Sequence, residues 1–128
     1  LLLYVEDVMH SGKDIPIVSS GTIVNEALHE ISKKNLGMTG VTDGDGKLIG
    51  VYTDGDLRRT LNQSTDVATR LIDDVMTPGP QTVTPRTLAA EVVELMRKRS
   101  INGVFFVNDS GQPVGALNAL DLMRSGIF

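Results

Sequence analysis

The chain has no cysteine, no tryptophan, and only two tyrosines and three phenylalanines among 128 residues. The lack of cysteine excludes disulfides and thiolate metal sites, and it fits a reducing compartment. No apolar run is long enough to span a membrane, and no signal peptide is visible. We therefore expect a cytoplasmic protein without a membrane partner.

Neither sign of charge is in large excess, since the formal net charge is only −4. No long basic run is present, so we expect no nucleic-acid partner. The short Arg97-Lys98-Arg99 cluster is typical of a solvated helix end. The chain starts Leu1-Leu2-Leu3-Tyr4 without methionine, so we expect a fragment of a longer protein whose upstream part carries the activity.

What the sequence does contain is a repeat. Gly50-Val51-Tyr52-Thr53-Asp54-Gly55-Asp56-Leu57 returns as Gly115-Ala116-Leu117-Asn118-Ala119-Leu120-Asp121-Leu122, in one register. Asp7-Val8-Met9 returns as Asp74-Val75-Met76 after a two-residue slip. A register kept this long indicates two copies of one structural unit, which pack as one module because each alone buries too little surface.

Both copies show the same local signals, which predict the order strand, helix, strand, strand, helix. Thr22 and Thr87 are the expected N-caps of the long helices. Apolar spacing and turn residues give the expected bounds, which are 17–18, 23–31, 38–42, 48–52 and 54–62 in the first copy, and 82–83, 88–96, 103–107, 114–118 and 119–124 in the second. A short helix is expected at 73–76. The predicted fold class is α/β (α+β), with repeat 1 and its connector at 1–62, a linker at 63–71 and repeat 2 at 72–128.

The acidic stretch Asp43-Gly44-Asp45-Gly46 has two possible interpretations, a calcium loop and a hairpin turn. Lys47 stands where a calcium loop needs a ligand, and Leu48 stands where it needs glycine. We therefore predict a hairpin turn. The two histidines, His10 and His29, are not expected to bind metal; His29 lies on a polar helix face, and His10 lies near the expected domain seam.

The repeated unit, with glycine, two apolar residues, a hydroxyl residue and aspartate before its last helix, resembles the CBS domain, and two in tandem resemble a Bateman module. Thr53-Asp54-Gly55-Asp56-Leu57-Arg58-Arg59, Asp7-Val8-Met9-His10 and Lys34-Asn35-Leu36-Gly37-Met38-Thr39 resemble the C-terminal region of bacterial arabinose 5-phosphate isomerases. That resemblance implies a missing N-terminal sugar isomerase domain and a role in Kdo synthesis for lipopolysaccharide or capsule. This fragment itself is not expected to be an enzyme.

The resemblance also implies ligand-binding residues. Asp56 would hold a ribose, Thr53 a phosphate or sugar oxygen, and Arg58 or Arg59 would add positive charge beside Asp54. In the second copy Asn118 replaces the hydroxyl residue, so any site at Asp121 is expected to be weaker or vacant. The alternative for both motifs is helix capping without a ligand.

Two loops and two glycines could each serve either ligand binding or the structure itself. The loops at 19–22 and 84–87 present hydroxyls, for which helix capping is the favoured role. Gly37 and Gly103 would allow a ligand close to the backbone or serve tight packing.

The predicted function is that of a regulatory and assembly module of a sugar phosphate isomerase. No cofactor is required, but an adenine or cytidine nucleotide, or CMP-Kdo, would bind between the repeats as regulator. A homodimer through the CBS helices is expected. The alternatives are a ligand-free dimerisation module, a CBS pair from another enzyme or a transporter, and an independent enzyme.

Overall fold

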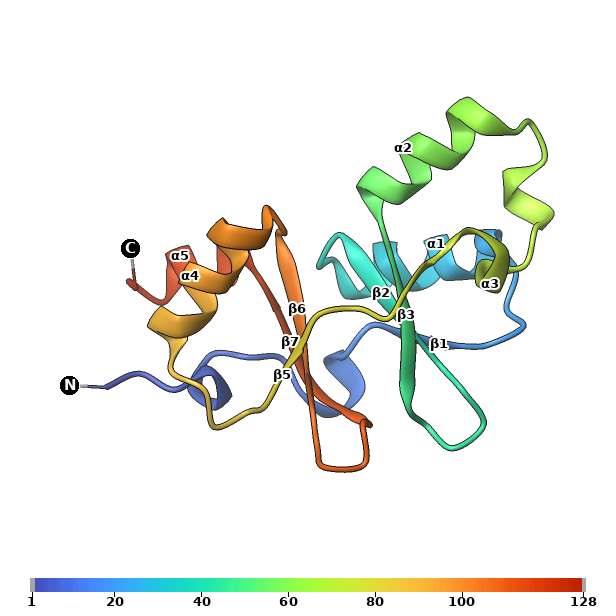
Figure 1. The fold of residues 1–128 in the computed structure, drawn as a ribbon. Helices are drawn as coiled ribbons and strands as arrows, with labels where there is room; N and C mark the ends of the chain where they lie inside the picture. The colour runs from blue at the N-terminus through green and yellow to red at the C-terminus, as the bar shows by residue number, and fades with distance from the viewer. Residues whose placement is uncertain (1, 128) are drawn as a thin grey trace. The chain divides into compact units, whose positions relative to one another are not determined.

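The computed structural model describes residues 2–127, and its chain divides into two packing units. The central unit is Pro16–Pro80, and the terminal unit combines Leu1–Ile15 with Gln81–Phe128. Both units contain a mixed sheet with helices, which confirms the predicted α+β class (Figure 1).

The central unit follows the predicted strand-helix-strand-strand-helix order. Its sheet has the order β1-β2-β3-β4, with β1 parallel to β2 and the other pairs antiparallel. The elements are β1 (Ile17–Ser19), α1 (Val24–Lys34), β2 (Met38–Thr42), β3 (Leu48–Thr53), α2 (Asp54–Gln63), the 3-10 turn η3 (Val67–Thr69), α3 (Ile72–Val75) and β4 (Thr77–Pro78).

The terminal unit repeats this pattern. β5 runs parallel to β6, and β6 runs antiparallel to β7. The elements are the 3-10 turns η1 (Val5–Asp7) and η2 (Gly12–Asp14), β5 (Thr82–Val83), α4 (Ala89–Arg99), β6 (Gly103–Val107), β7 (Pro113–Asn118) and α5 (Ala119–Arg124). The predicted elements are therefore present in both copies, with ends that differ by at most three residues.

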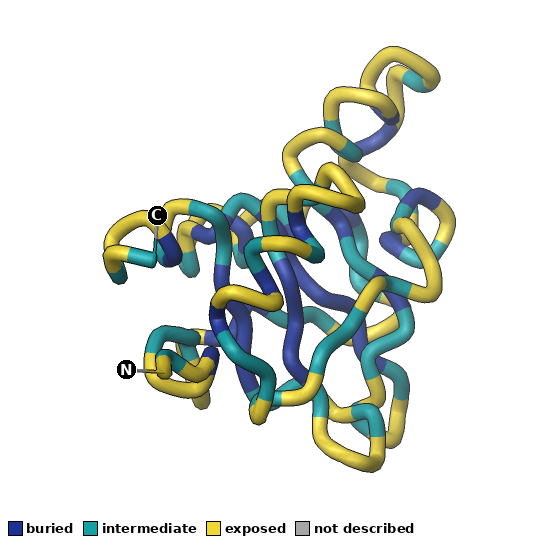
Figure 2. Tube along the Cα trace, turned by 60° about the vertical axis from the view of Figure 1, so that its left-hand side comes forward, coloured by how far each residue is buried: buried dark blue, intermediate teal, exposed yellow. Residues whose placement is uncertain are grey.

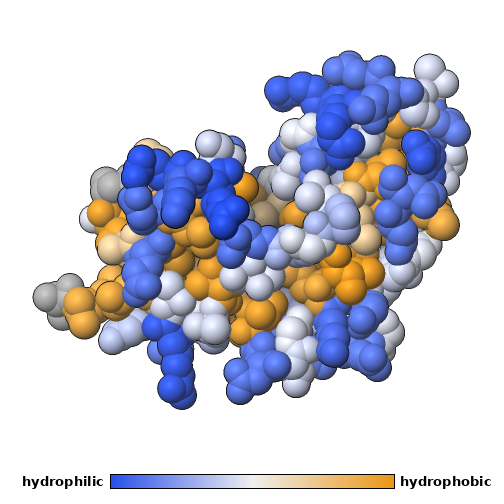
Figure 3. All heavy atoms as spheres, in the orientation of Figure 1, coloured by the Kyte–Doolittle hydropathy of each residue, from blue (hydrophilic) through white to orange (hydrophobic). Residues whose placement is uncertain are grey.

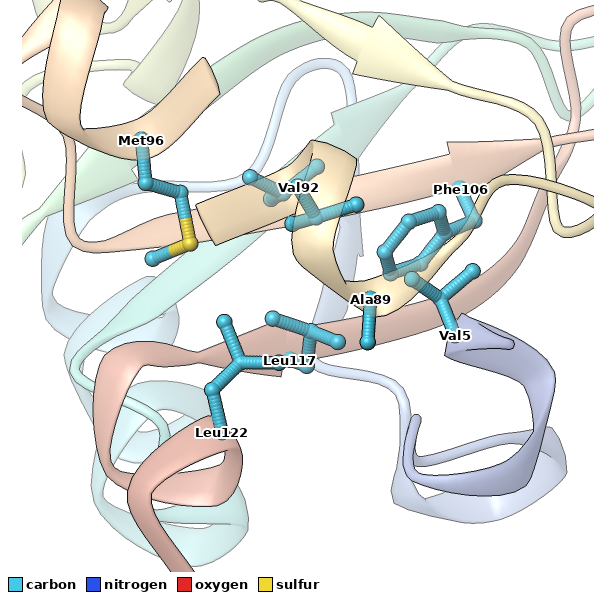
Figure 4. Close-up of a cluster of buried hydrophobic side chains, with 8 residues drawn as sticks. Val5, Ala89, Val92, Met96, Phe106, Leu117 and Leu122 are labelled. Atoms are coloured by element: carbon cyan, nitrogen blue, oxygen red, sulfur yellow. The ribbon is translucent and has the colours of Figure 1, made fainter. Parts of the chain in front are cut away.

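Each unit has its own apolar core, and the buried residues concentrate on strands and on the inner helix faces (Figure 2). In the terminal unit Phe106 of β6 and Leu117 of β7 meet Val92 of α4, and all three are fully buried (Figure 4). In the central unit Tyr52 of β3 is fully buried, and its hydroxyl lies 2.7 Å from Thr60 Oγ1 on α2.

The packing units do not follow the sequence repeats. The segment 7–10 packs on the second repeat, while the segment 74–77 packs on the first. His10 forms a β-bridge with Ala116 of β7, and β4 pairs with β3 at the matching position, where Thr77 lies opposite Val51. The units are defined by packing, so they do not test the division of the sequence at 63–71. Val67, inside that stretch, is buried in the central core.

The predicted N-caps of the long helices are wrong. The N-cap residues of α1 and α4 are Ile23 and Leu88, and neither of these side chains accepts a hydrogen bond from its helix. The carbonyls of Thr22 and Thr87 instead accept the N–H groups of Ile72 and Val5, at 2.7 and 3.0 Å. These two threonines lie where a second segment pairs with the backbone, since Ile23 bridges Leu71 and Tyr4 bridges Leu88. That pairing moves the helix start and leaves the hydroxyls without a capping role.

The acidic stretch at residue 43 forms the predicted hairpin turn. Asp43 Oδ1 accepts the N–H groups of Asp45 and Lys47, both at 2.9 Å. Asn108 Oδ1 does the same for Ser110 and Gln112 in the second copy. The side-chain oxygen is therefore used inside the turn.

Glu30 of α1 accepts a backbone hydrogen bond from the edge strand β1, and its lowered pKa predicts that stability depends on pH. Its Oε2 accepts the N–H of Ile17 at 3.0 Å and Lys34 Nζ at 2.7 Å. Burial alone would raise the pKa of Glu30, but the hydrogen bonds from Lys34 and Ile17 and the charges of Lys34 and Lys33 outweigh it, so this pKa lies below its ordinary value. A lowered pKa stabilises the fold at any pH above the unfolded pKa, and this contribution is lost as pH falls through the folded pKa.

We expect Glu30→Gln to lower the free energy of unfolding by about 0.5 to 1 kcal/mol near pH 7, because the amide keeps an acceptor but loses the charge. The difference from wild type should shrink as pH falls below the ordinary glutamate range. Urea denaturation at about pH 7 and about pH 3 measures both values. Glu26→Gln, at an exposed position of the same helix, is the control. A difference that persists unchanged in acid would contradict this role for the Glu30 charge.

Candidate ligand-binding site

Thr53 and Asp56 join the end of β3 to the start of α2. Thr53 is the N-cap, and its Oγ1 accepts the N–H of Asp56 at 3.1 Å. Asp56 Oδ2 accepts the N–H of Thr53 at 3.0 Å in return. This reciprocal capping box satisfies two backbone donors at the helix end. The capping role considered from the sequence is thus present.

The other oxygen of Asp56 faces two further donors. Arg59 Nη2 and Thr77 Oγ1 each lie 3.3 Å from Asp56 Oδ1, and Arg59 Nη2 also reaches the carbonyl of Val75 at 3.2 Å. These contacts are long for charge-assisted hydrogen bonds, and the Arg59 side chain is 47% exposed. Asp56 Oδ1 is therefore the atom at this motif whose partners a ligand hydroxyl could replace at low cost.

The remaining first-motif candidates are exposed at the start of α2. Asp54 and Arg58 are both exposed, and Figure 3 shows hydrophilic side chains over this helix. The N–H of Asp54 donates to the carbonyl of Gly37 at 3.1 Å. Gly37 has φ of 73°, and a Cβ there would lie 3.4 Å from Asp54 Oδ2. The structure thus brings Gly37, Thr53, Asp54 and Asp56 together. Arg59 contacts the carboxylate of Asp56, whereas Arg58 is exposed to solvent.

The second motif has the same cap with a different residue. Asn118 Oδ1 accepts the N–H of Asp121 at 3.0 Å, and Asp121 Oδ2 accepts the N–H of Asn118 at 2.9 Å. The amide oxygen therefore replaces the threonine hydroxyl without loss of the capping box. Asp121 Oδ1 lies 3.0 Å from His10 Nε2. Sequence reasoning did not connect His10 to Asp121; the two-residue slip that aligns Asp7-Val8-Met9-His10 with the segment ending at Thr77 was the available signal.

The hydroxyl loops differ from their predicted role. Ser20 Oγ and the N–H of Gly21 donate to the two carboxylate oxygens of Asp73, the latter at 2.7 Å. These donors hold the pKa of Asp73 below its ordinary value. In the second copy Thr84 Oγ1 lies 3.4 Å from Thr87 Oγ1. Gly103 begins β6 and pairs with Asn118, so it serves the sheet.

His29 is exposed, as its polar helix face predicted. It borders an open pocket of about 410 Å³ with Glu26, Glu30 and Lys33. Within residues 2–127 no group of three or more histidine, cysteine, aspartate or glutamate side chains is placed to hold a metal ion. No helix in the described part of the chain has the length and apolar character to cross a membrane.

Two mixed α and β units, each with a glycine, two apolar residues, a polar cap and an aspartate at the start of its last helix, define a tandem repeat module of the CBS type. The match to the CBS domain family extends over residues 5–63 and 72–127. The chain therefore belongs to the CBS domain family and contains a pair of these domains.

Curated relatives include arabinose 5-phosphate isomerase KdsD of Pseudomonas aeruginosa, which is 49% identical over 128 residues, and the KdsD protein of Escherichia coli K12, which is 44% identical over 127 residues. The match covers 100% and 99% of this chain but only 39% and 38% of those proteins. The chain thus spans about two fifths of their length and resembles their CBS region.

Among solved structures, the CBS domain pair of protein MJ0100 in complex with 5′-methylthioadenosine and S-adenosyl-L-methionine is similar, with a TM-score of 0.87 and 25% identity. That alignment covers 98% of this chain and 97% of the other. CBSX2 in complex with AMP has a TM-score of 0.84 and 25% identity, covering 98% and 96%. These similarities confirm the predicted CBS pair fold.

Proposed function

We propose that the chain is the regulatory and assembly module of a sugar phosphate isomerase of the arabinose 5-phosphate type, and that it binds a nucleotide or nucleotide sugar. The observation that carries the proposal is the identity of 49% and 44% to KdsD proteins over essentially the whole chain. The module itself has a binding role, and catalysis belongs to an isomerase domain of the parent protein. The same relationship supports the proposal of a place in the Kdo pathway and in the cytoplasm.

The first motif is the proposed ligand site. Two vicinal ribose hydroxyls would donate to Asp56 Oδ1, taking the places of Arg59 and Thr77 at 3.3 Å. The released Arg59 guanidinium, together with Arg58 and the Thr53 hydroxyl, would then be available to a phosphate. Adenine ligands are the first choice because two similar CBS pairs hold adenine compounds; a cytidine nucleotide or CMP-Kdo is the alternative class.

Regulation requires the ligand to prefer one arrangement of the module over another. The route to an isomerase domain would be the segment Leu1–Met9, of which the part from Leu3 to Met9 packs in the terminal unit. A ligand that changes the hold on this segment would change the position of whatever precedes it. Dimerisation through CBS helices would carry the same signal to a second subunit.

A second candidate is a ligand-free assembly module, which one observation favours. Both motif carboxylates already have partners within the chain, and α5 exposes Leu120 (45%) and Met123 (55%) to solvent. In this case the motifs only cap their helices, and the exposed apolar side chains contact a second subunit.

Thermal melting with AMP, ADP, ATP, CMP and CMP-Kdo separates the two candidates. A ligand at about 100 times its Kd adds about 2.7 kcal/mol of stability, which raises the midpoint by several degrees. We expect Asp56→Asn to abolish the shift, each variant being compared with its own ligand-free midpoint. Asparagine is preferred to alanine because Asp56 also closes the capping box of α2.

The matched control is Asp121→Asn in the second motif, which should keep the shift. Retention of the full shift in Asp56→Asn would remove Asp56 from the ligand site. The absence of a shift with every ligand would favour the assembly module.

A further inference from the structure

The N-terminal segment, defined as Leu3–His10, is built into the second repeat. The N–H of Val5 donates to the carbonyl of Thr87 at 3.0 Å, and the N–H of Ala89 donates to the carbonyl of Leu3 at 2.8 Å. Val5 is fully buried and points toward Ala89 and Phe106 (Figure 4). One end of the segment is thus part of the core of the terminal unit.

The other end of the segment is held at the second motif. His10 and Ala116 exchange two backbone hydrogen bonds, at 2.8 and 3.0 Å. Met9 lies over Gly115, where a Cβ would come within 2.1 Å of its sulfur. His10 Nε2 then meets Asp121 Oδ1 at 3.0 Å, and the Asp121 side chain is only 15% exposed. Four consecutive backbone or side-chain contacts therefore end on the motif carboxylate.

The carboxylate of the first motif, Asp56, has different partners. Thr77, the counterpart of His10, and Arg59 share Asp56 Oδ1 at 3.3 Å each. In the second motif the counterpart of Arg59 is Arg124, which is exposed, and the imidazole takes the oxygen at a shorter distance. An imidazole is a bulkier donor than a threonine hydroxyl, and it forms a charge-assisted pair when protonated.

We infer that His10 is an internal occupant of the second motif, which latches the N-terminal segment onto Asp121 and makes the segment and a ligand hydroxyl competitors for the same carboxylate oxygen. Asp121 Oδ2 is used by the Asn118 N–H, so Oδ1 is the oxygen left for either partner. The two motifs are then unequal in purpose. The first is open to a ligand, and the second fixes the segment that leads upstream. Latching by His10 is independent of the proposed function, whereas competition with a nucleotide rests on it.

Amide hydrogen exchange at His10 and Ala116 tests the latch, because these two amides bond to each other's residues across the docked end. We expect His10→Ala to speed their exchange about fivefold to tenfold, which corresponds to the loss of one hydrogen bond. His10→Gln, which keeps a side-chain donor, should restore part of the protection. The matched control Thr77→Ala, at the same place in the central unit, should leave both amides as in wild type. Unchanged protection in His10→Ala would overturn the latch.

Competition is tested with AMP as the probe, followed at the backbone resonances of residues 118–121. We expect AMP to bind the second motif at least fivefold more tightly in His10→Ala than in wild type. Equal affinity in the two proteins, or AMP at Asp121 with His10 still protected, would overturn competition. AMP binding at Asp56 alone in both proteins would do the same while leaving the proposed function intact. If AMP binds neither motif, the nucleotide function and the competition fall together, and the latch is judged on exchange.

Discussion

Replacing Phe106 with alanine is expected to lower the free energy of unfolding of the terminal unit by about 3 to 5 kcal/mol. Phe106 is fully buried on β6, and the side chains around it come from three separate parts of the chain, namely Val5, Val92 of α4 and Leu117 of β7. These neighbours are held by backbone hydrogen bonds and cannot collapse into the space that the ring leaves. The loss of transfer free energy and the cavity therefore add.

Urea denaturation followed by amide exchange within β6 and α4 measures this loss. Phe106→Leu, which keeps most of the apolar contact, should cost less, about 1 to 2 kcal/mol. Val41→Ala tests the same repeat position in the central unit, where the smaller side chain should cost about 1 to 2 kcal/mol. A loss below about 1 kcal/mol in Phe106→Ala would mean that the ring does not hold the three parts together.

The elements of the fold could be predicted from the sequence because their signals are local. Apolar spacing marks α1 and α4, and the turns at Asp43 and Asn108 hold their own backbone through side-chain oxygens. The repeat adds strength, since each copy predicts the other. The hairpin pairs β2–β3 and β6–β7 and the capping boxes at Thr53 and Asn118 follow from neighbouring residues.

The tertiary partners of short segments could not be predicted in this way. Thr22 and Thr87 are good capping residues by type, but their carbonyls pair with Ile72 and Val5, which are distant in sequence. The same applies to the N-terminal segment, whose contacts lie more than a hundred residues away at Ala116 and Asp121. Local propensity carries no information about which strand edge a segment will join.

The motif aspartates show why the ligand site is harder to predict than the fold. Each carboxylate uses one oxygen for the backbone of its own cap, so conformity to the motif is explained by helix stability alone. The proposed ligand binding depends on the second oxygen, whose partners are Arg59 and Thr77 in one case and His10 in the other. Arg59 belongs to the first motif, but Thr77 and His10 come from outside the motifs, and only the structure assigns these two.

The glycine that opens each motif is explained by a methionine from the preceding Asp-Val-Met segment. A Cβ on Gly115 would lie 2.1 Å from the sulfur of Met9, and a Cβ on Gly50 would lie 2.3 Å from that of Met76. Since both glycines are buried, the methionines must move if the glycines gain a side chain. This contact accounts for the joint repetition of the Asp-Val-Met segment and the motif glycine in the sequence.

We expect Gly115→Ala to destabilise the terminal unit by about 1 to 3 kcal/mol, because Met9 must leave its place over β7. Met9→Ala in the same chain should recover much of this loss, since it removes the atoms that clash. A double-mutant cycle over Gly115→Ala and Met9→Ala measures the coupling, and Met76→Ala combined with Gly115→Ala is the unmatched control. Additive losses for Met9 and Gly115 would show that the methionine does not depend on the glycine. Coupling confined to the matched pair would show that each Asp-Val-Met segment is matched to its strand by the methionine–glycine contact. His10 or Thr77 then completes the contact one residue later.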